Sequence, residues 1–249
     1  YKENNFFSGA ILAGSIGIAV GTALNFKLKK NNKNVVFTGF GDGATDQGIF
    51  WEALNYSSLK KLPIVFLCEN NNYSTFTSQN KRLGGKAIFE KARAFGIESE
   101  VMFGNDVVQI YKSLKKKISQ IRKNNRPFLL ETITYRYSGH VGPKSDEHQD
   151  YRSNSEYLFW KNNDPVYLLE KKLIEKKILD ESYIKKLKYT FIKEIKNEFK
   201  ISRKQKYLKF KNWNSLNLSS KKIHDKKILA NLKSKKFNIN QKNTIIKGY

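Results

Sequence analysis

Cysteine is almost absent from this 249-residue sequence, and its one cysteine, Cys68, excludes an internal disulfide. A lone thiol is typical of proteins in a reducing compartment, so we expect a cytoplasmic location. The three histidines, His140, His148 and His224, are scattered along the chain. With a single cysteine they do not give the ligand spacing of a zinc site.

Long hydrophobic runs are also absent. The longest apolar stretch, residues 10–24, is rich in glycine and is too short to span a bilayer. No compact basic segment precedes it, as one would in a signal peptide. We therefore expect a buried loop and helix here and no membrane partner. The sequence begins with Tyr1 and not with Met, so we expect the true N-terminus to be missing.

Arginine and acidic residues are scarce in a chain whose net charge is +25. Only 7 of the 47 basic residues are arginine, although arginine dominates bidentate contacts to phosphates and bases. An AT-rich coding sequence accounts for the many lysines, asparagines and isoleucines. The charge is +8 in residues 1–150 and +17 in residues 151–249. We do not expect nucleic acid as a partner, and a non-catalytic basic binding protein is kept as an alternative.

Hydrophobic patterning predicts alternating strands and helices in residues 1–150. The second strand is apolar on both faces, which is typical of parallel sheets covered by helices. We therefore expect an α/β fold, with a parallel sheet and helices on both of its faces. The expected strands are residues 35–40, 64–68, 98–103 and 127–136, and the expected helices are residues 15–29, 46–60, 86–95 and 106–123.

Local signals refine these elements. Thr45 is the expected N-cap of the second helix, which should bury Ile49, Ala53 and Leu54. Asp106 is expected to cap the fourth helix. Residues 70–82 are expected to form a polar loop.

The pattern changes to helices after residue 150. Asp164 and Pro165 have the residue types of an N-cap and first helical position, and Asp180 is expected to cap a long helix that ends near residue 204. The predicted organisation is an α/β domain in residues 1–150, a helical C-terminal part of the same domain in 151–204, and a lysine-rich tail in 205–249.

The most specific feature is Gly41-Asp42-Gly43 followed, 26 residues later, by Asn70-Asn71. A helix of about 14 residues rises roughly 21 Å, and a six-residue strand returns roughly 20 Å. The unit therefore starts and ends at the carboxyl ends of two parallel strands, which is the edge where ligands bind in α/β sheets. Asp42 and Asn71 are expected to meet at this edge.

The chemistry of these residues suits a metal and a phosphate. Asp42 offers a carboxylate and Asn71 an amide oxygen, which are hard ligands for Mg²⁺. The glycines beside Asp42 allow a phosphate to approach the backbone, and the following helix directs its positive end there. The residues alone thus predict a site for Mg²⁺ and a diphosphate. The alternative is an ordinary turn followed by an ordinary loop.

The spacing of GDG and NN matches the thiamine-diphosphate binding motif. The longer string from Gly41 to Ser78 resembles the α subunit of the E1 component of 2-oxo acid dehydrogenases of the pyruvate, branched-chain and acetoin types. The resemblance runs from about residue 7 to about residue 200. Further family landmarks follow in order, namely GND at 104–106, TYRYSGH at 134–140, YRS at 151–153 and NDP at 163–165.

The resemblance implies thiamine diphosphate and Mg²⁺ as cofactors. Asp42 and Asn71 would bind Mg²⁺ through their side chains, and Tyr73 would bind it through its backbone carbonyl. Gly43 and Ala44 would donate backbone N–H groups to the diphosphate.

Three further residues are implied around the organic part of the cofactor. Ala10 would contact the aminopyrimidine through its backbone, and Leu12 would pack against the cofactor. His140 matches the catalytic histidine that reaches the cofactor and its intermediates. A histidine of a surface loop is the alternative for His140.

The implied activity is oxidative decarboxylation of a 2-oxo acid, with transfer of the acyl unit to a lipoyl group on an E2 acyltransferase. The implied assembly is an α2β2 heterotetramer, because the carboxylate that activates the aminopyrimidine belongs to the E1 β subunit. The family also carries an upstream segment with a Tyr-Arg pair that helps to hold the diphosphate. Because this segment is not present here, we expect the chain to be a fragment.

The segment HVGPKSDEHQDYR at 140–152 departs from the pyruvate-type pattern. Val141 stands where members controlled by phosphorylation carry serine, so we do not expect that control. The segment is closer to E1α-like proteins associated with surface-polysaccharide genes, so a thiamine-diphosphate-dependent lyase or transferase of sugar metabolism is an alternative. Four charged residues either bind substrate or order the loop, namely Arg136, Asp146, His148 and Arg152.

Overall fold

The computed structural model describes residues 6–30, 33–142 and 151–206. The chain divides into two units, Tyr1–Ile184 and Lys185–Tyr249, and the first unit contains the sheet and the candidate site. Within the described ranges, no helix has both the length and the apolar composition needed to cross a bilayer.

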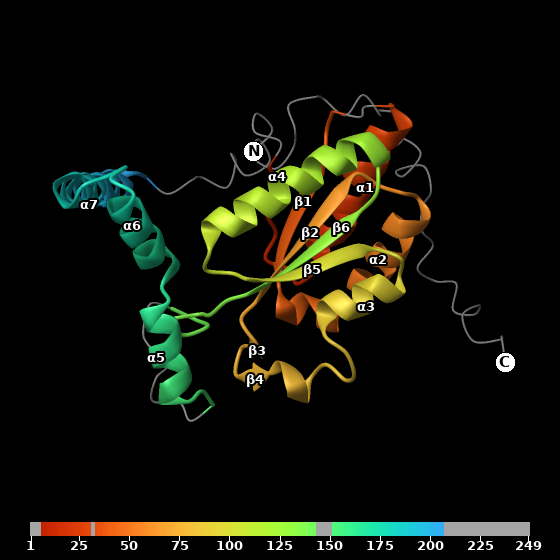
Figure 1. Ribbon diagram of the computed structural model, residues 1–249, viewed down its shortest axis with the longest axis horizontal. Helices are drawn as coiled ribbons and strands as arrows, with labels where there is room; N and C mark the ends of the chain where they lie inside the picture. The colour runs from red at the N-terminus through yellow and green to blue at the C-terminus, as the bar shows by residue number, and fades with distance from the viewer. Residues whose placement is uncertain (1–5, 31–32, 143–150, 207–249) are drawn as a thin grey trace, which may run out of the picture. The chain divides into compact units, whose positions relative to one another are not determined.

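The sheet has four strands in the order β1-β2-β6-β5, and every pair is parallel (Figure 1). This confirms the predicted parallel α/β fold. β2 is buried along most of its length because it pairs on both sides and is covered on both faces. The strands are β1 (Val36–Gly41), β2 (Ile64–Asn70), β5 (Glu98–Phe103) and β6 (Phe128–Ile133).

Helices cover both faces of the sheet, as predicted. Alternate residues of a strand point to opposite faces, and Phe66 and Cys68 of β2 pack in a core cluster with the helices of one face. Val65 of β2 belongs to a second cluster, to which α4 contributes Ile121. The helices of the first face are α1 (Gly14–Leu28), α2 (Gly48–Leu59) and α3 (Ile88–Ala94), and the second face is covered by α4 (Val107–Asn124). The Asp106 carboxylate caps α4 as predicted, because it accepts from the N–H groups of its first turn.

The Gly-rich turn after β1 is a 3-10 helix, η1 (Asp42–Asp46), and this changes the start of α2. The predicted cap Thr45 is wrong. Gln47 is the N-cap residue of α2, whereas Thr45 is buried in η1 and its hydroxyl donates to the Asp42 carbonyl oxygen at 2.7 Å. The hydroxyl stabilises the turn that presents Asp42 and not the helix that follows.

The inward face of α2 also differs in one position. Ala53 and Leu54 are buried as predicted, together with Phe50. Ile49 is 42% exposed, so its predicted burial is wrong. Because Phe50, Ala53 and Leu54 define one helical face, Ile49 lies beside that face and towards the end of the sheet where η1 lies.

The segment 70–82 is more ordered than the predicted loop. It contains a short antiparallel pair, β3 (Tyr73–Ser74) and β4 (Thr77–Ser78), and a 3-10 turn, η2 (Gln79–Lys81). The Gln79 N–H donates to the Asn72 carbonyl at 2.8 Å and ties the end of the hairpin to its beginning.

Three helices follow the sheet, namely α5 (Asn154–Asn162), α6 (Pro165–Glu175) and α7 (Glu181–Lys204). Asp164 caps α6 and Pro165 opens it, as predicted. The Asp180 carboxylate accepts from the Tyr183 N–H at 2.8 Å, which confirms the predicted cap of α7.

The family landmarks GND, TYRYSGH and NDP meet where α5 joins the sheet. The Asn105 side chain donates to the Asn163 carbonyl at 2.7 Å and accepts from the Thr134 hydroxyl at 3.0 Å. The Trp160 ring of α5 stacks on Tyr135, with ring centroids 5.8 Å apart. The landmarks therefore hold the first C-terminal helix on the sheet.

Gly104 of this joint has no room for a side chain. A Cβ there would lie 2.8 Å from the Ile133 carbonyl oxygen, which also accepts the Gly104 N–H at 2.7 Å. We expect Gly104→Ala to lower the free energy of unfolding by about 1–3 kcal/mol because the strand end must shift. Gly21→Ala is the control, since nothing lies within 4 Å of its Cβ, and alanine should stabilise this exposed helical position by roughly 0.5–1 kcal/mol. Urea unfolding measures both, and equal effects of the two variants would contradict the prediction.

Candidate functional site

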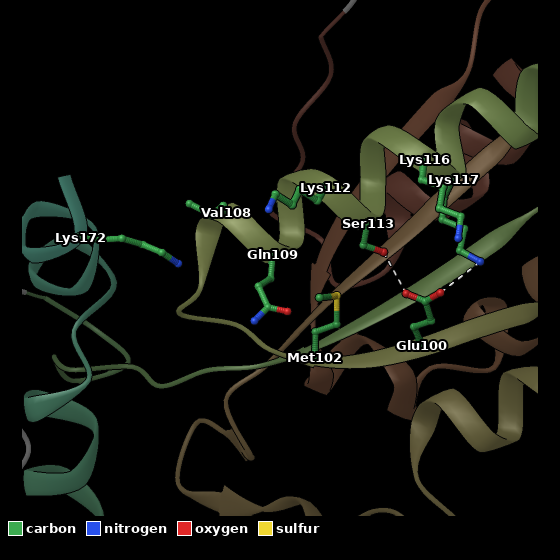
Figure 2. A pocket seen from close by; sticks show the side chains of 9 residues that line it. All are labelled: Glu100, Met102, Val108, Gln109, Lys112, Ser113, Lys116, Lys117 and Lys172. Carbon is green, nitrogen blue, oxygen red and sulfur yellow. Dashed lines mark hydrogen bonds and ion pairs between the residues drawn. The ribbon is translucent and has the colours of Figure 1, made fainter. Parts of the chain in front are cut away.

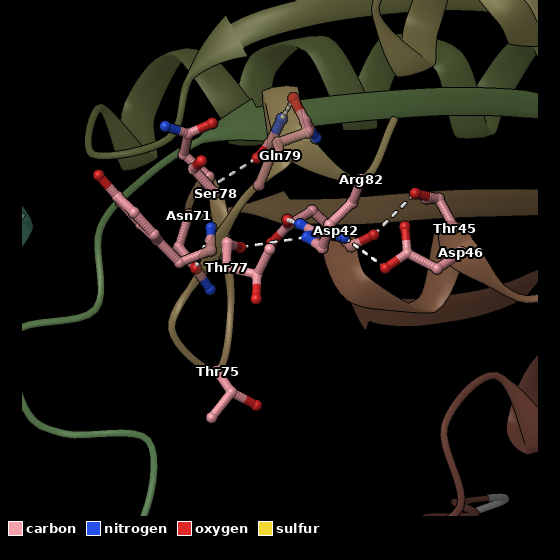
Figure 3. A network of polar contacts seen from close by, with 12 residues as sticks. Asp42, Thr45, Asp46, Asn71, Thr75, Thr77, Ser78, Gln79 and Arg82 are labelled. Carbon is pink, nitrogen blue, oxygen red and sulfur yellow. Dashed lines mark hydrogen bonds and ion pairs between the residues drawn. The ribbon is translucent and has the colours of Figure 1, made fainter. Parts of the chain in front are cut away.

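Asp42 is the buried acidic group at the carboxyl end of β1. Its side chain is only 1% exposed, and its Oδ2 atom forms an ion pair with Arg82 (Figure 3). Its other oxygen, Oδ1, is buried and has no hydrogen-bond partner among the described residues. A buried carboxylate oxygen without a donor is costly, and the described residues leave this oxygen of Asp42 unused.

Arg82 lies between two carboxylates. One guanidinium nitrogen donates to Asp42 and another donates to Asp46, while Nε donates to the Thr77 carbonyl at 3.1 Å. The guanidinium is planar, so its fork of donors can serve two carboxylates at once. The sequence reasoning missed Arg82 and Asp46. The one available signal was an arginine, rare in this chain, in the segment that returns from Asn71 to the same edge.

Burial raises the pKa of Asp42 above its ordinary value. The charge and hydrogen bond of Arg82, and the backbone amides of Asn71 and Asp42 itself, oppose part of that rise. The carboxylate therefore lies beside the Asn71 backbone, as the spacing of the motif predicts. Arg82 is the neighbouring cation that acts to lower this pKa.

Gly41 pairs with Glu69 in the parallel register. The chain therefore leaves β1 at Asp42 and β2 at Asn71 at nearly the same level of the sheet edge. The Asn71 side-chain oxygen accepts from the Tyr73 N–H at 3.1 Å. This bond orients the amide, and an amide oxygen has a second lone pair for a further contact.

Glu131 of β6 positions the asparagine pair. Its carboxylate accepts from the Asn70 side chain at 2.6 Å and from the Phe89 N–H at 2.8 Å, and it is 2% exposed. The sequence reasoning missed this buried acid, because a single glutamate within an apolar strand has no local signature. Glu69, which directly precedes the pair, is exposed.

The Tyr73 ring is buried and its hydroxyl donates to Glu156 of α5 at 3.0 Å. Burial and this carboxylate raise the pKa of Tyr73 to about 12. The side chain is therefore a structural anchor that leaves the backbone of Tyr73 at the site. Metal binding by its carbonyl stays a prediction.

Gly43 and Ala44 are buried within η1. A Cβ on Gly43 would lie 2.7 Å from Ser74 Oγ. A side chain at position 43 would require Ser74 of the β3–β4 hairpin to shift. The predicted backbone contacts of both residues with a diphosphate stay predictions.

Ala10 and Leu12 are exposed and directly precede α1. The beginning of α1 lies beside the beginning of α2, since a Cβ on Gly17 would lie 3.2 Å from Ile49 Cδ1. This places the segment that carries Ala10 and Leu12 near the same end of the sheet. Its contact with a cofactor stays a prediction.

His140 is exposed, and no described contact joins it to Asp42 or Asn71, so its catalytic role stays a prediction. Arg136 donates to the Thr75 carbonyl and to the Tyr151 hydroxyl, both at 2.9 Å. Arg152 donates to the Arg136 carbonyl. These contacts favour the ordering role of the two arginines, whereas Asp146 and His148 lie outside the described residues.

A separate pocket of about 490 Å³ is lined by α4 and β5, with Lys172 of α6 at its border (Figure 2). Its buried Lys117 forms ion pairs with Glu98 and Glu100. Burial acts to lower the pKa of Lys117, but the two carboxylates outweigh it and raise that pKa. The lining contains none of the predicted site residues, so the pocket is distinct from the edge where Asp42 lies.

The Asp42 site, formed by Asp42, Asp46, Asn71 and Arg82, offers carboxylate and amide oxygens to a cation. The described part of the chain has no group of three or more His, Cys, Asp or Glu that could hold a metal. One carboxylate with an unused buried oxygen and one amide oxygen are the small, hard donor set that Mg²⁺ takes when phosphate completes its shell.

Comparison with known proteins identifies the family. The family model described as "Dehydrogenase E1 component" matches residues 1–211. The pyruvate dehydrogenase E1 component subunit alpha of Rickettsia felis is 34% identical over 196 residues, which are 78% of this chain and 59% of the relative. The 2-oxoisovalerate dehydrogenase subunit alpha of Bacillus subtilis is 32% identical over 190 residues, which are 72% of this chain and 57% of the relative.

The chain thus spans somewhat more than half the length of these curated relatives. A solved structure of a putative thiamin diphosphate-dependent enzyme from Mycobacterium smegmatis is 22% identical, with a TM-score of 0.38, over 49% of this chain and 22% of that one. The fold therefore rests on the strands and helices of this chain itself.

We expect Glu131→Leu to lower the free energy of unfolding by about 2–4 kcal/mol, because the Asn70 amide and the Phe89 N–H lose their buried acceptor. Glu131→Gln retains one acceptor oxygen and should cost less. Urea unfolding at neutral pH measures the difference. A leucine variant as stable as the glutamine variant would show that Glu131 does not anchor Asn70.

Tyr73→Phe removes the hydrogen bond to Glu156 and should cost about 1 kcal/mol at pH 7–9. The pKa of Tyr73 is raised in the folded state to about 12, so this stabilisation is complete below the unfolded pKa of about 10. It is lost as the pH rises through the folded value. Unfolding of both proteins between pH 8 and 12 should show a difference that narrows above pH 10, and a difference constant with pH would refute this assignment.

Proposed function

This chain belongs to the dehydrogenase E1 component family, and we propose that it forms the metal- and diphosphate-binding part of an α subunit of a 2-oxo acid dehydrogenase. The proposed activity is oxidative decarboxylation of a 2-oxo acid, with transfer of the acyl unit to a lipoyl group. The observation that carries the proposal is the buried Asp42, whose Oδ1 has no partner among the described residues, beside the Asn71 backbone at the carboxyl edge of the sheet.

The residues of the Asp42 site fit thiamine diphosphate and Mg²⁺. Asp42 and Asn71 would hold Mg²⁺ through oxygen atoms, with the Tyr73 carbonyl as a third ligand. Gly43 and Ala44 would offer backbone N–H groups to the diphosphate at the start of η1 and α2, where the helix dipole favours negative charge.

When bound, thiamine diphosphate supplies a carbon nucleophile and an electron sink for the bond to the departing carboxyl group. The residues of this chain then bind and orient. Leu12 would pack against the organic part of the cofactor, and Ala10 would contact it through its backbone. His140 would donate a hydrogen bond to the reacting oxygen, a task that suits a side chain able to change charge near neutral pH.

We also propose the partners that this chemistry requires. An E1 β subunit would complete the active site in an α2β2 assembly, and a lipoyl acyltransferase would accept the acyl unit. A cytoplasmic location belongs to the same proposal, and the buried free thiol of Cys68 fits a reducing compartment.

Thermal unfolding of the full-length α–β pair, with and without thiamine diphosphate and Mg²⁺, tests this function. Ligand at one hundred times its dissociation constant stabilises the native state by about 2.7 kcal/mol, so the midpoint should rise by several degrees. We expect Asp42→Asn to abolish the rise, because a neutral amide replaces the carboxylate that holds the metal.

Glu69→Gln is the matched control, since Glu69 is an exposed acid of the same strand end. It should keep the rise of the wild-type protein. No rise in the wild-type pair, or the same rise in Asp42→Asn, would refute the cofactor site. A panel of 2-oxo acids with a lipoyl acceptor then identifies the substrate.

A further inference from the structure

We propose that Arg82 is the counter-ion of the unloaded Asp42 site, and that a divalent cation must displace its guanidinium from Asp42 in order to bind. The inference rests on the proposed function, in which Asp42 is a metal ligand, and it adds a role for a residue outside the GDG and NN motifs. Arg82 is a positioning residue in this role, because it acts through the carboxylate that holds the metal.

The first argument is the cost of a buried negative charge. Asp42 is 1% exposed and Arg82 is 11% exposed, so both partners of this ion pair lie away from bulk solvent. A carboxylate in such surroundings stays ionised only when a cation or several donors face it. Oδ1 has no partner among the described residues and Oδ2 has the guanidinium. Arg82 therefore supplies the positive charge that faces this carboxylate.

The second argument is that the guanidinium and a metal ion compete for the same carboxylate. Arg82 already holds Oδ2, and a divalent ion on Oδ1 would lie within a few ångströms of the positive guanidinium. Two positive charges so close in a weakly solvated site repel each other strongly. Binding of the metal alone must therefore overcome the loss of the Arg82–Asp42 pair.

The third argument is that Arg82 has other hydrogen-bond partners that it can keep when it leaves Asp42. Its other donors hold Asp46, whose side chain is 28% exposed, and the Thr77 carbonyl. The backbone around it is fixed by the bond from the Leu83 N–H to the Gln79 carbonyl at 2.8 Å. The guanidinium can thus leave Asp42 by a side-chain movement while it keeps Asp46.

A diphosphate changes this balance because it restores negative charge beside the displaced guanidinium. Arginine forms strong, directional hydrogen bonds with phosphate oxygens. The metal is consequently disfavoured alone and favoured together with the diphosphate. Arg82 would make metal binding depend on the organic cofactor.

The test uses the full-length α–β pair and Mn²⁺ as the probe, with free Mn²⁺ followed by electron paramagnetic resonance. We expect Arg82→Gln to bind Mn²⁺ alone about tenfold more tightly than the wild-type pair, since removal of one adjacent charge changes such an equilibrium by a factor of ten or more. Saturating thiamine diphosphate should then increase Mn²⁺ affinity less in Arg82→Gln than in the wild-type pair. The unloaded variant should also unfold at a lower temperature.

Lys81→Gln is the matched control, because Lys81 is the exposed neighbour that carries the same charge. It should leave the affinity for Mn²⁺ within about twofold, since exposed charges are screened. Arg82→Lys keeps the charge but loses the fork, so it should fall between the wild type and Arg82→Gln, and it remains informative if Arg82→Gln does not fold. Asp42→Asn should abolish the specific binding of Mn²⁺ in every background.

Unchanged or weaker Mn²⁺ affinity in Arg82→Gln, with binding that still requires Asp42, would overturn the counter-ion role and leave the proposed function standing. Binding that does not require Asp42 in any variant would instead refute the metal site itself.

Discussion

The parallel register of β1 against β2 is the constraint on which the candidate site depends. Because Gly41 pairs with Glu69, the chain leaves both strands at the same level, and Asp42 and Asn71 emerge side by side. The register is itself fixed by burial. A slip of one residue would turn Phe66 and Cys68 out of the core cluster of α1, α2 and α3. The same strand register thus determines both the packing of the core and the placement of the site.

The buried carboxylates at this edge of the sheet are paired with specific donors. Asp42 faces Arg82 and Glu131 faces the amides of Asn70 and Phe89. Each buried carboxylate that had neither a cation nor a hydrogen-bond donor would cost the folded state several kcal/mol. The network therefore stabilises the fold before any ligand arrives, and it leaves one oxygen of Asp42 without a donor among the described residues.

The family landmarks outside the binding motif connect α5 to the sheet. Asn105 joins β5 to the end of α5, and Trp160 covers Tyr135. Glu156, also on α5, holds the Tyr73 hydroxyl. Helix α5 is consequently tied to the β3–β4 hairpin, which begins at Tyr73.

The sequence by itself determined the parallel sheet, the helices on both faces, the caps Asp106, Asp164 and Asp180, and the meeting of Asp42 with Asn71. These follow from local periodicity and from the fixed rise of helices and strands. Only the tertiary structure decided the partners of the site residues, which are 40 residues apart for Asp42 and Arg82, 61 for Asn70 and Glu131, and 83 for Tyr73 and Glu156.

The cap of α2 was also decided by the fold, because η1 takes Thr45 into a buried turn and leaves Gln47 at the helix start. A local pattern carries the conformation of its own segment. It carries no information on which distant charge or amide will pair with a buried group, because such partners come together only when separate elements pack.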